Sequence, residues 1–187
     1  MNKPRPSHLH PVEEAGALEG PFRRLIQNPV KIVGRYVRPG MTIVDLGCGT
    51  GYFTFEMAGL AGPTGKVIAA DVQDGMLEIL RRKLEGDEMR QNIMIHKCGE
   101  NHLGLTEKVD FILAFYAFHE MEYIDEIIPE LKGLLKPEAE ILIAEQKFHV
   151  PKHAFDTLVR KMADNGFVIC ERPGIFFSRA VVMRIGN

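Results

Sequence analysis

The feature that most constrains the fold of this chain is a turn in which three glycines alternate, at Gly47, Gly49 and Gly51. The residues before it, 41–44, are short, mostly apolar and β-branched, which is typical of a parallel strand buried on both faces. The residues after it, 52–60, carry apolar side chains at helical spacing. A glycine at every second position lets the backbone adopt φ > 0 and lets a ligand lie against it. The pattern predicts a strand, a ligand-binding turn and a helix.

The spacing of these glycines separates two kinds of nucleotide site. A dinucleotide fingerprint reads G-x-G-x-x-G and seats a pyrophosphate on the helix N-terminus. Here the glycines occupy every second position, and Asp45 stands two residues ahead of the first. No pyrophosphate site is therefore expected. Glycine-rich turns also occur between strands and helices for structural reasons alone, and that interpretation stays open.

Asp71 is the second signal, because it ends the apolar run 66–70 and lies twenty positions beyond Gly51. A carboxylate at the end of the second strand can accept hydrogen bonds from both ribose hydroxyls of an adenosine. The same residue would serve NAD equally well, and it can also simply cap the following helix. The choice depends on the rest of the chain.

Length and composition are those of one ordinary globular domain: 187 residues, 45% hydrophobic and 26% charged. The net charge of −2 gives no general attraction to nucleic acid. No apolar segment is long enough to span a bilayer, and no apolar h-region follows the basic residues at the N-terminus. We therefore expect a cytoplasmic protein without a nucleic-acid or membrane partner, and the sequence leaves its oligomeric state open.

The three cysteines, Cys48, Cys98 and Cys170, are far apart and form no C-x-x-C pair. Neither a disulfide framework nor a zinc site is expected, and each thiol is predicted to be a small apolar residue in or beside the sheet. His8 and His10 have no third ligand at useful spacing, so we expect no metal site.

The remaining pattern alternates strands with helices, which predicts a parallel sheet with right-handed crossovers. Residues 1–20 have no periodicity and are expected to form an irregular arm, whereas 21–187 form one domain. Asn28 and Asp74 are predicted to cap helices, and Pro129 is predicted to kink or restart another. Further strands are expected at 92–97, 109–115 and 138–144, with helical stretches before the last two. A helix at 154–165, ended by Gly166, then precedes a hairpin of 167–171 and 175–185, whose short connection requires antiparallel strands.

Several stretches in this order resemble the class I S-adenosylmethionine (SAM) dependent methyltransferases. Asp45 to Gly51 resembles motif I of that family, and Asp71-Val72-Gln73 with Met76 resembles its ribose and adenine edge. Residues 110–114 resemble the fourth strand, and 134–137 resemble the Leu-Lys-Pro approach to the fifth. The resemblance spans about residues 29–185 and is nearest to quinone-biosynthesis C-methyltransferases. It implies a doubly wound, Rossmann-like α/β fold with a seven-stranded sheet in the order 3-2-1-4-5-7-6, in which strand 7 is antiparallel.

The resemblance implies in-line SN2 transfer of a methyl group from SAM to a small-molecule acceptor, which leaves S-adenosylhomocysteine. No nucleophilic side chain is obligatory, because orienting two reactants can supply roughly 7–11 kcal/mol of the barrier. The cofactor-binding residues that it implies are Asp45, Gly47, Cys48, Gly49, Gly51, Asp71, Val72, Gln73, Met76, Gly99, Glu100, Asn101 and Ala114.

The chain departs from the family pattern in two places. The region 98–102 lacks the usual Asp toward the adenine amino group, so Glu100 or Asn101 is the expected substitute. The two glycines that usually follow Leu-Lys-Pro are replaced by Glu138 and Ala139, so that turn cannot need φ > 0 at both positions.

Tyr116, His119, Glu120 and Glu145 are the candidates for removing a proton from the acceptor, and His119 has the most suitable ordinary pKa, about 6.5. Packing or core hydrogen bonding is an open alternative for each. Residues 1–20 are expected to act as a lid over the acceptor. Two other functions also stay open: a non-catalytic SAM or nucleotide-binding regulator, and an NAD-binding protein with an aberrant loop.

Overall fold

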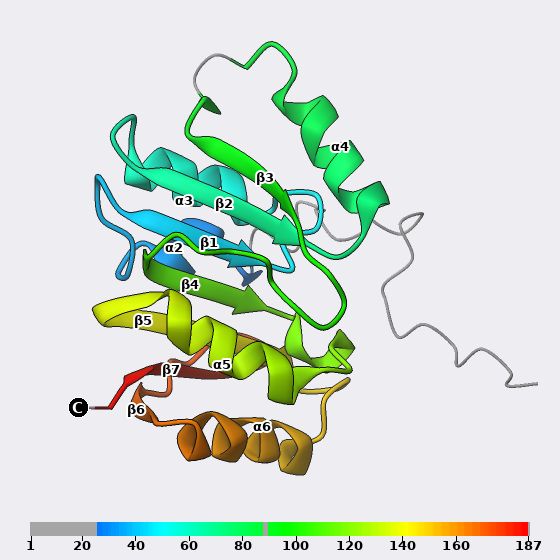
Figure 1. Cartoon of the computed structure of the whole chain (residues 1–187), viewed down its shortest axis with the longest axis vertical. Helices are drawn as coiled ribbons and strands as arrows, with labels where there is room; N and C mark the ends of the chain where they lie inside the picture. The colour runs from blue at the N-terminus through cyan, green and yellow to red at the C-terminus, as the bar shows by residue number, and fades with distance from the viewer. Residues whose placement is uncertain (1–25, 88–89, 187) are drawn as a thin grey trace, which may run out of the picture.

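The seven strands of this computed structural model form one sheet, in the order β3-β2-β1-β4-β5-β7-β6 (Figure 1). The structure describes residues 26–87 and 90–186. The predicted arm and lid at residues 1–20, with His8 and His10, lies outside the described residues and stays a prediction.

The strand order predicted from the sequence is confirmed. Strands β1 to β5 are parallel to one another, whereas β7 runs antiparallel to both β5 and β6. The antiparallel ending follows from the short connection between β6 and β7, which leaves no room for a crossover. The strands are β1 Thr42–Leu46, β2 Lys66–Asp71, β3 Ile93–Lys97, β4 Val109–Phe115, β5 Leu135–Gln146, β6 Phe167–Glu171 and β7 Ser178–Ile185.

Helices cover both faces of the sheet, because successive side chains of each central strand point to opposite sides. Ile43 of β1 packs in the core cluster with residues of α2 and α3, whereas its neighbour Val44 packs in the cluster with residues of α5 and α6. Helices α5 and α6 lie on the viewer's side of the sheet in Figure 1. The helical elements are α2 Pro29–Val33, α3 Thr54–Ala61, α4 Asp74–Leu84, the 3-10 turn η3 Phe118–Glu120, α5 Ile124–Leu134 and α6 Lys152–Asp164.

Two of the three helix boundaries predicted from single residues are confirmed. The Asn28 side chain accepts a hydrogen bond from the Lys31 N–H at 3.1 Å, and Gly166 follows α6 at φ +90°. The prediction for Asp74 is wrong: it is the first residue of α4, and Gln73 is the cap. The Asp74 carboxylate instead lies 2.8 Å from the Lys97 ammonium, on the neighbouring end of β3.

The structure overturns two further expectations. Residues 98–108, between β3 and β4, form no helix. Local hydrogen bonds hold this loop instead: Gly99 N–H donates to the His102 carbonyl, and Leu103 N–H donates to the Glu130 carboxylate. Of the two outcomes expected at Pro129, a kink or a restart, the restart does not occur, because α5 continues through the proline.

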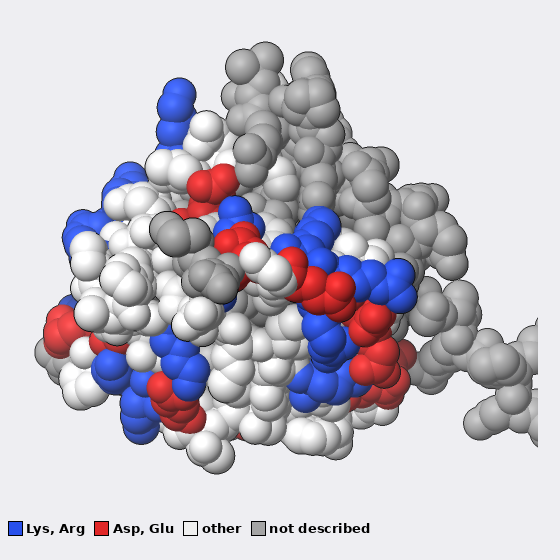
Figure 2. Space-filling model, turned by 90° about the horizontal axis from the view of Figure 1, so that it is seen from above, with Lys and Arg blue, Asp and Glu red and all other residues white. Residues whose placement is uncertain are grey.

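Cys48 and Cys98 are buried thiols, as expected, whereas Cys170 is exposed on the edge strand β6. None of the helices in the described part of the chain has the length and apolar character needed to cross a bilayer. On the face seen in Figure 2, basic and acidic side chains lie next to one another.

The first part of β5 contains a strained residue. Glu138 adopts φ +66°, while Ala139 does not have positive φ, so only the first of the two glycines usual in this family would be needed here. The register of β5 against β4 shifts between Leu135, which pairs with Val109, and Glu140, which pairs with Phe111. A left-handed conformation costs a non-glycine residue about 1–2 kcal/mol.

We predict that Glu138→Gly stabilises the protein by about 1 kcal/mol, because glycine adopts φ > 0 without a Cβ clash. Denaturant unfolding measures this change. The control is Glu138→Ala, which also removes the 3.6 Å ion pair with Arg184 but keeps the Cβ, and it should not stabilise. Equal stability of the two variants would contradict the prediction.

Candidate functional site

The three glycines of the loop between β1 and α3 all have positive φ, but they differ in what surrounds them. A Cβ on Gly47 would lie 2.7 Å from the Cβ of Ala117, and one on Gly51 would lie 2.7 Å from Leu80 Cδ1. A Cβ on Gly49 would meet no atom of the described residues within 4 Å. Gly47 and Gly51 are therefore required by packing inside the protein, whereas the described residues leave open space beside Gly49.

Asp71, at the end of β2, is bonded to this loop. One carboxylate oxygen accepts from Gly49 N–H at 2.9 Å, and the other accepts from Gln73 N–H at 2.8 Å. The side chain is nearly buried, and burial raises the pKa of Asp71 against the opposing effect of these hydrogen bonds. Asp71 thus holds the N-cap residue of α4 but does not itself cap the helix, and it lies beside the one glycine of the three that faces open space.

Asp45 lies inside the protein where β1 turns into the glycine loop. It is 3% exposed, and its carboxylate accepts a hydrogen bond from the Thr54 hydroxyl at 2.5 Å. Burial raises the pKa of Asp45 to about 7, opposed by the Thr54 hydrogen bond and assisted by the negative charge of Asp71. Since Thr54 is the first residue of α3, Asp45 fixes the helix to the loop.

The other residues predicted to bind a cofactor are differently placed. Cys48, Met76 and Ala114 are buried, and Val72 and Gln73 are partly buried in the turn before α4. Gly99 is packed under the His102 ring, whereas Glu100 and Asn101 are exposed, with Asn101 bonded to His102. The loop after β3 is held beside Asp71, because the Cys98 N–H donates to the Asp71 carbonyl at 2.9 Å.

Tyr116 follows β4 with φ +64°, an unusual conformation for a residue with a bulky side chain. Its hydroxyl lies 2.7 Å from the Ser178 hydroxyl and also bonds to the Gln27 amide. The Gln27 amide donates in addition to the Phe176 carbonyl at 2.9 Å. Sequence analysis missed Gln27 and Ser178, because each lies far from Tyr116 in the chain and no local pattern joins them.

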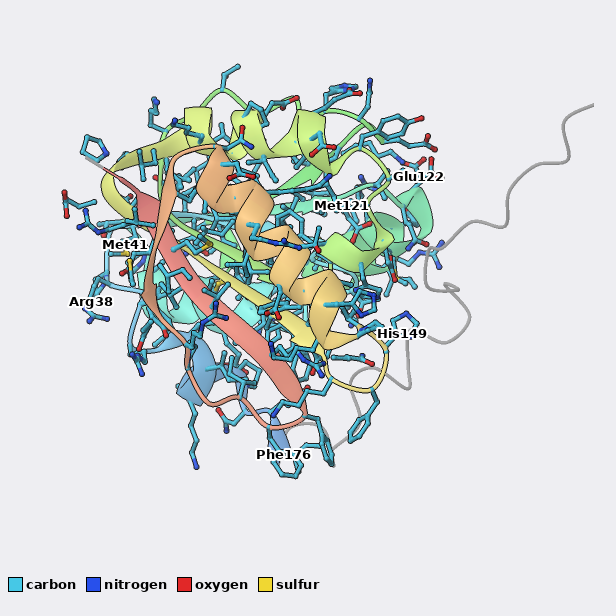
Figure 3. All side chains as sticks on the ribbon, turned by 90° about the horizontal axis from the view of Figure 1, so that it is seen from below. Arg38, Met41, Met121, Glu122, His149 and Phe176 are labelled. Atoms are coloured by element: carbon cyan, nitrogen blue, oxygen red, sulfur yellow. The ribbon has the colours of Figure 1, made fainter. Side chains whose placement is uncertain are left out.

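His119 and Glu145 come together at the carboxyl ends of β4 and β5. His119 Nδ1 lies 2.7 Å from Glu145 Oε2, and the His119 backbone N–H donates to Glu145 Oε1 at 3.2 Å. Burial opposes protonation of the His119 ring. The hydrogen bond and charge of Glu145, with the charge of Glu120, outweigh burial, so the pKa of His119 is raised above 6.5. The ring of His149, which Figure 3 shows beside the start of α6, lies 4.9 Å from that of His119.

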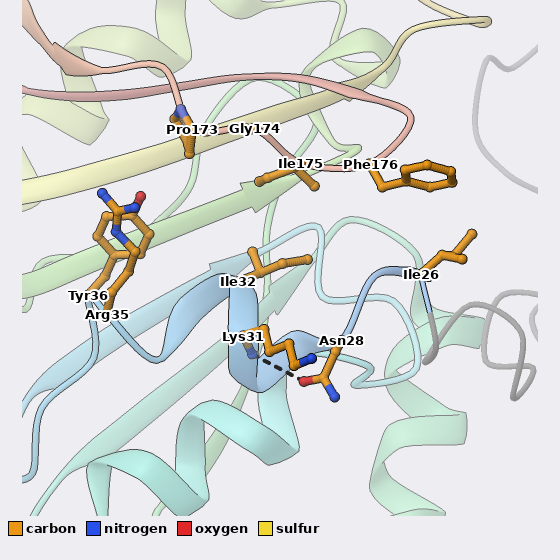
Figure 4. A pocket seen from close by; sticks show the side chains of 10 residues that line it. All are labelled: Ile26, Asn28, Lys31, Ile32, Arg35, Tyr36, Pro173, Gly174, Ile175 and Phe176. Carbon is orange, nitrogen blue, oxygen red and sulfur yellow. Dashed lines mark hydrogen bonds between the residues drawn. The ribbon is translucent and has the colours of Figure 1, made fainter.

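A hollow of about 290 Å³ lies beside α2 and the β6–β7 connection, away from the glycine loop (Figure 4). Phe176 lines this hollow, and its carbonyl accepts from the Gln27 amide, which also bonds to the Tyr116 hydroxyl. No cluster of three His, Cys, Asp or Glu side chains suited to a metal ion is found within 26–87 and 90–186. The hollow is lined by Ile26, Asn28, Lys31, Ile32, Arg35, Tyr36, Pro173, Gly174, Ile175 and Phe176.

The sheet order, the antiparallel β7 and the glycine loop bonded to Asp71 together define the class I methyltransferase fold. The chain belongs to the methyltransferase domain family, whose model matches residues 38–172. The resemblance noted in the sequence is therefore confirmed at the level of family and fold.

The chain is 31% identical over 128 residues to a ubiquinone/menaquinone biosynthesis C-methyltransferase of Shewanella frigidimarina, a match that covers 68% of this chain and 49% of the relative. It is 29% identical over 110 residues to a demethylmenaquinone methyltransferase of Lactobacillus johnsonii, covering 58% and 45%. The chain thus spans about half the length of these relatives. A SAM-dependent methyltransferase structure from Aquifex aeolicus shares the fold with TM-score 0.85 at 24% identity, covering 95% of this chain and all of the other.

We predict that Asp45 makes stability fall as pH rises. An unfolded Asp loses its proton near pH 3.9, whereas folded Asp45 retains it up to about pH 7. The folded state therefore binds more protons between these values, and stability decreases across that interval. Relative to the parent, Asp45→Asn should gain stability from pH 5 to pH 8, on the order of a few kcal/mol at most. Denaturant unfolding at both pH values measures the gain.

The matched control for Asp45→Asn is Asp164→Asn, which changes an exposed carboxylate at the end of α6. Its stability relative to the parent should not depend on pH in this range. If Asp45→Asn behaves in the same way as the control, burial of Asp45 does not govern this pH dependence.

Proposed function

We propose that this chain is an enzyme that transfers the methyl group of SAM to a small-molecule acceptor and releases S-adenosylhomocysteine. The observation that carries the proposal is the space that the described residues leave open beside Gly49, next to the Asp71 carboxylate. At Gly47 and Gly51, protein atoms already occupy the position that a Cβ would take. The backbone at Gly49 is instead open to a ligand beside Asp71. The cofactor would supply an electrophilic methyl group on a sulfonium.

The proposed cofactor side consists of the loops that meet at Asp71. Its carboxylate would accept hydrogen bonds from the ribose hydroxyls, since each oxygen has lone-pair capacity beyond the single amide that it already holds. Gly49 would let the cofactor approach the backbone. Val72, Gln73, Met76 and the loop Gly99 to Asn101 would border the adenosine, and Asp45, Gly47, Cys48, Gly51 and Ala114 would hold the loop and strand beneath it.

The proposed acceptor side lies at the carboxyl ends of β4 and β5, with Tyr116, His119 and Glu145. In a parallel sheet the carboxyl ends of neighbouring strands share one edge, so this group lies at the same edge as the glycine loop. A small acceptor is supported by the short connections after these strands, residues 116–123 and 147–151, which offer little surface for a folded macromolecule. The names of the quinone-biosynthesis relatives agree with a small acceptor.

We also propose that the protein works in the cytoplasm and has no nucleic-acid or membrane partner. The support is chemical: a net charge of −2, mixed charges on the face in Figure 2, and two buried free thiols at Cys48 and Cys98. A reducing compartment suits such thiols.

We predict that SAM and S-adenosylhomocysteine bind with similar affinity and that NAD does not, because the loop has no pyrophosphate site. Isothermal calorimetry measures all three ligands. Gly49→Asn should abolish SAM binding while the protein stays folded by circular dichroism, since asparagine tolerates positive φ and would place its side chain in the open space. Binding of NAD as tight as that of SAM would sink the proposal.

Asp71→Ala should weaken SAM binding roughly 10- to 100-fold, because a hydrogen bond to a charged group is worth about 1.5–3 kcal/mol. Asp71→Asn should fall between the parent and Asp71→Ala, since it keeps one acceptor oxygen. The matched control is Asp74→Ala, three residues away, whose side chain is exposed and pairs only with Lys97 among the described contacts. Calorimetry compares the three variants. If Asp71→Ala and the control bind SAM equally well, Asp71 is only a structural residue.

A further inference from the structure

His119 and Glu145 make more hydrogen bonds to each other than packing of the surrounding elements requires. Glu145 is 1% exposed and directs both carboxylate oxygens at one residue, one to the His119 ring and one to its backbone N–H. A buried carboxylate is costly unless it is paired and hydrogen-bonded. The two contacts therefore fix both the position of the residue and the orientation of its ring.

The same contacts select the chemical form of the imidazole. In the neutral ring one nitrogen carries the proton and the other is an acceptor, and the hydrogen bond made by one nitrogen decides which. Because Glu145 is the partner of Nδ1, the proton of the neutral ring stays on Nδ1. Nε2 is left with its lone pair, and the nearest charged group described for it, Glu120 Oε1, is 3.8 Å away, beyond hydrogen-bonding distance.

This nitrogen belongs to the segment that touches the glycine loop. A Cβ on Gly47 would lie 2.7 Å from Ala117, so the loop packs directly on the chain two residues before His119. The Tyr116 N–H, which begins this segment, donates to the Ala144 carbonyl next to Glu145 at 2.8 Å. One stretch of chain thus joins the glycine loop to the buried carboxylate.

We propose that His119 is the proton acceptor of the reaction and that Glu145 is its positioning residue, so that the methyl acceptor is a group carrying a dissociable proton. This inference rests on the proposed function. The acceptor's proton passes to Nε2 of His119 while the acceptor atom bonds to the methyl carbon, and the carbon–sulfur bond breaks with its electron pair going to sulfur. The Glu145 carboxylate, bonded to Nδ1, orients the ring and faces the imidazolium that forms.

The pKa of the His119 ring depends on the charged groups that face it. Within residues 26–87 and 90–186 they are Glu145 from β5, Glu120 from η3, and His149 from the β5–α6 connection. The two carboxylates favour the imidazolium, whereas a second imidazolium at His149 or a nearby sulfonium disfavours it. A methyl donor placed for attack beside Nε2 must therefore lower the pKa of His119.

The test is an NMR titration of the His119 ring in the whole protein, in saturating SAM and in saturating S-adenosylhomocysteine. These two ligands differ by the methyl group and its positive charge. We expect the neutral ring to carry its proton on Nδ1, and its pKa to be lower with SAM than with S-adenosylhomocysteine by at least about half a unit. His153, exposed on α6, serves as the internal control and should show no difference between the ligands.

Two variants separate the positioning of the His119 ring by Glu145 from the effect of a nearby negative charge on the pKa of His119. Glu145→Gln keeps an acceptor for Nδ1 but removes the charge, so the pKa of His119 should fall in the free protein. Glu120→Gln removes a carboxylate near Nε2, so the pKa should fall less and the Nδ1–H tautomer should remain. If either variant does not fold, the parent titration decides the question alone.

A proton on Nε2 in the neutral ring, or an equal His119 pKa with both ligands, would overturn the inference and leave His119 and Glu145 as a structural pair. In that case SAM still binds in the calorimeter and the proposed function stands. Failure of SAM to bind would instead remove the proposed function and this inference together.

Discussion

Asp71 is the residue on which the geometry of the site depends, because it holds three separate loops with three oxygens. Its carboxylate binds the glycine loop at Gly49 and the start of α4 at Gln73, while its carbonyl binds the loop after β3 at Cys98. Backbone N–H groups in buried loops must find acceptors, and a strand-terminal carboxylate supplies them at one point. The same carboxylate is the proposed ribose ligand, so structure and binding are coupled at this residue.

The sheet places this point beside the acceptor side of the site. Parallel strands β1, β2 and β4 end at one edge, and the glycine loop leaves that edge by packing against Ala117 after β4. Because Gly47 has no Cβ, the two loops approach more closely than any other residue would allow. The lack of a side chain at Gly47 and the small side chain of Ala117 thus set the distance between the proposed cofactor and acceptor groups.

Buried carboxylates recur at the site, and each is satisfied by a different partner. Asp45 has the Thr54 hydroxyl, Asp71 has backbone N–H groups, and Glu145 has the His119 ring and backbone. Burial alone would favour the neutral acid in all three places. A site that keeps several acidic groups out of water reduces stability in return for preorganised polar groups, which is the usual compromise at functional sites.

The sequence by itself determined the cap at Asn28 and the position of Asp71, since apolar periodicity and strand-ending carboxylates are local signals, and its resemblance to a known family supplied the strand order. It misplaced a cap at Asp74 and a helix before β4, where contacts with Lys97 and Glu130 override local preference. Only the tertiary structure decided which of the three glycines faces open space, that Glu145 binds His119, and that Gln27 and Ser178 meet Tyr116. These facts depend on the packing of segments distant in the chain, which no local pattern encodes.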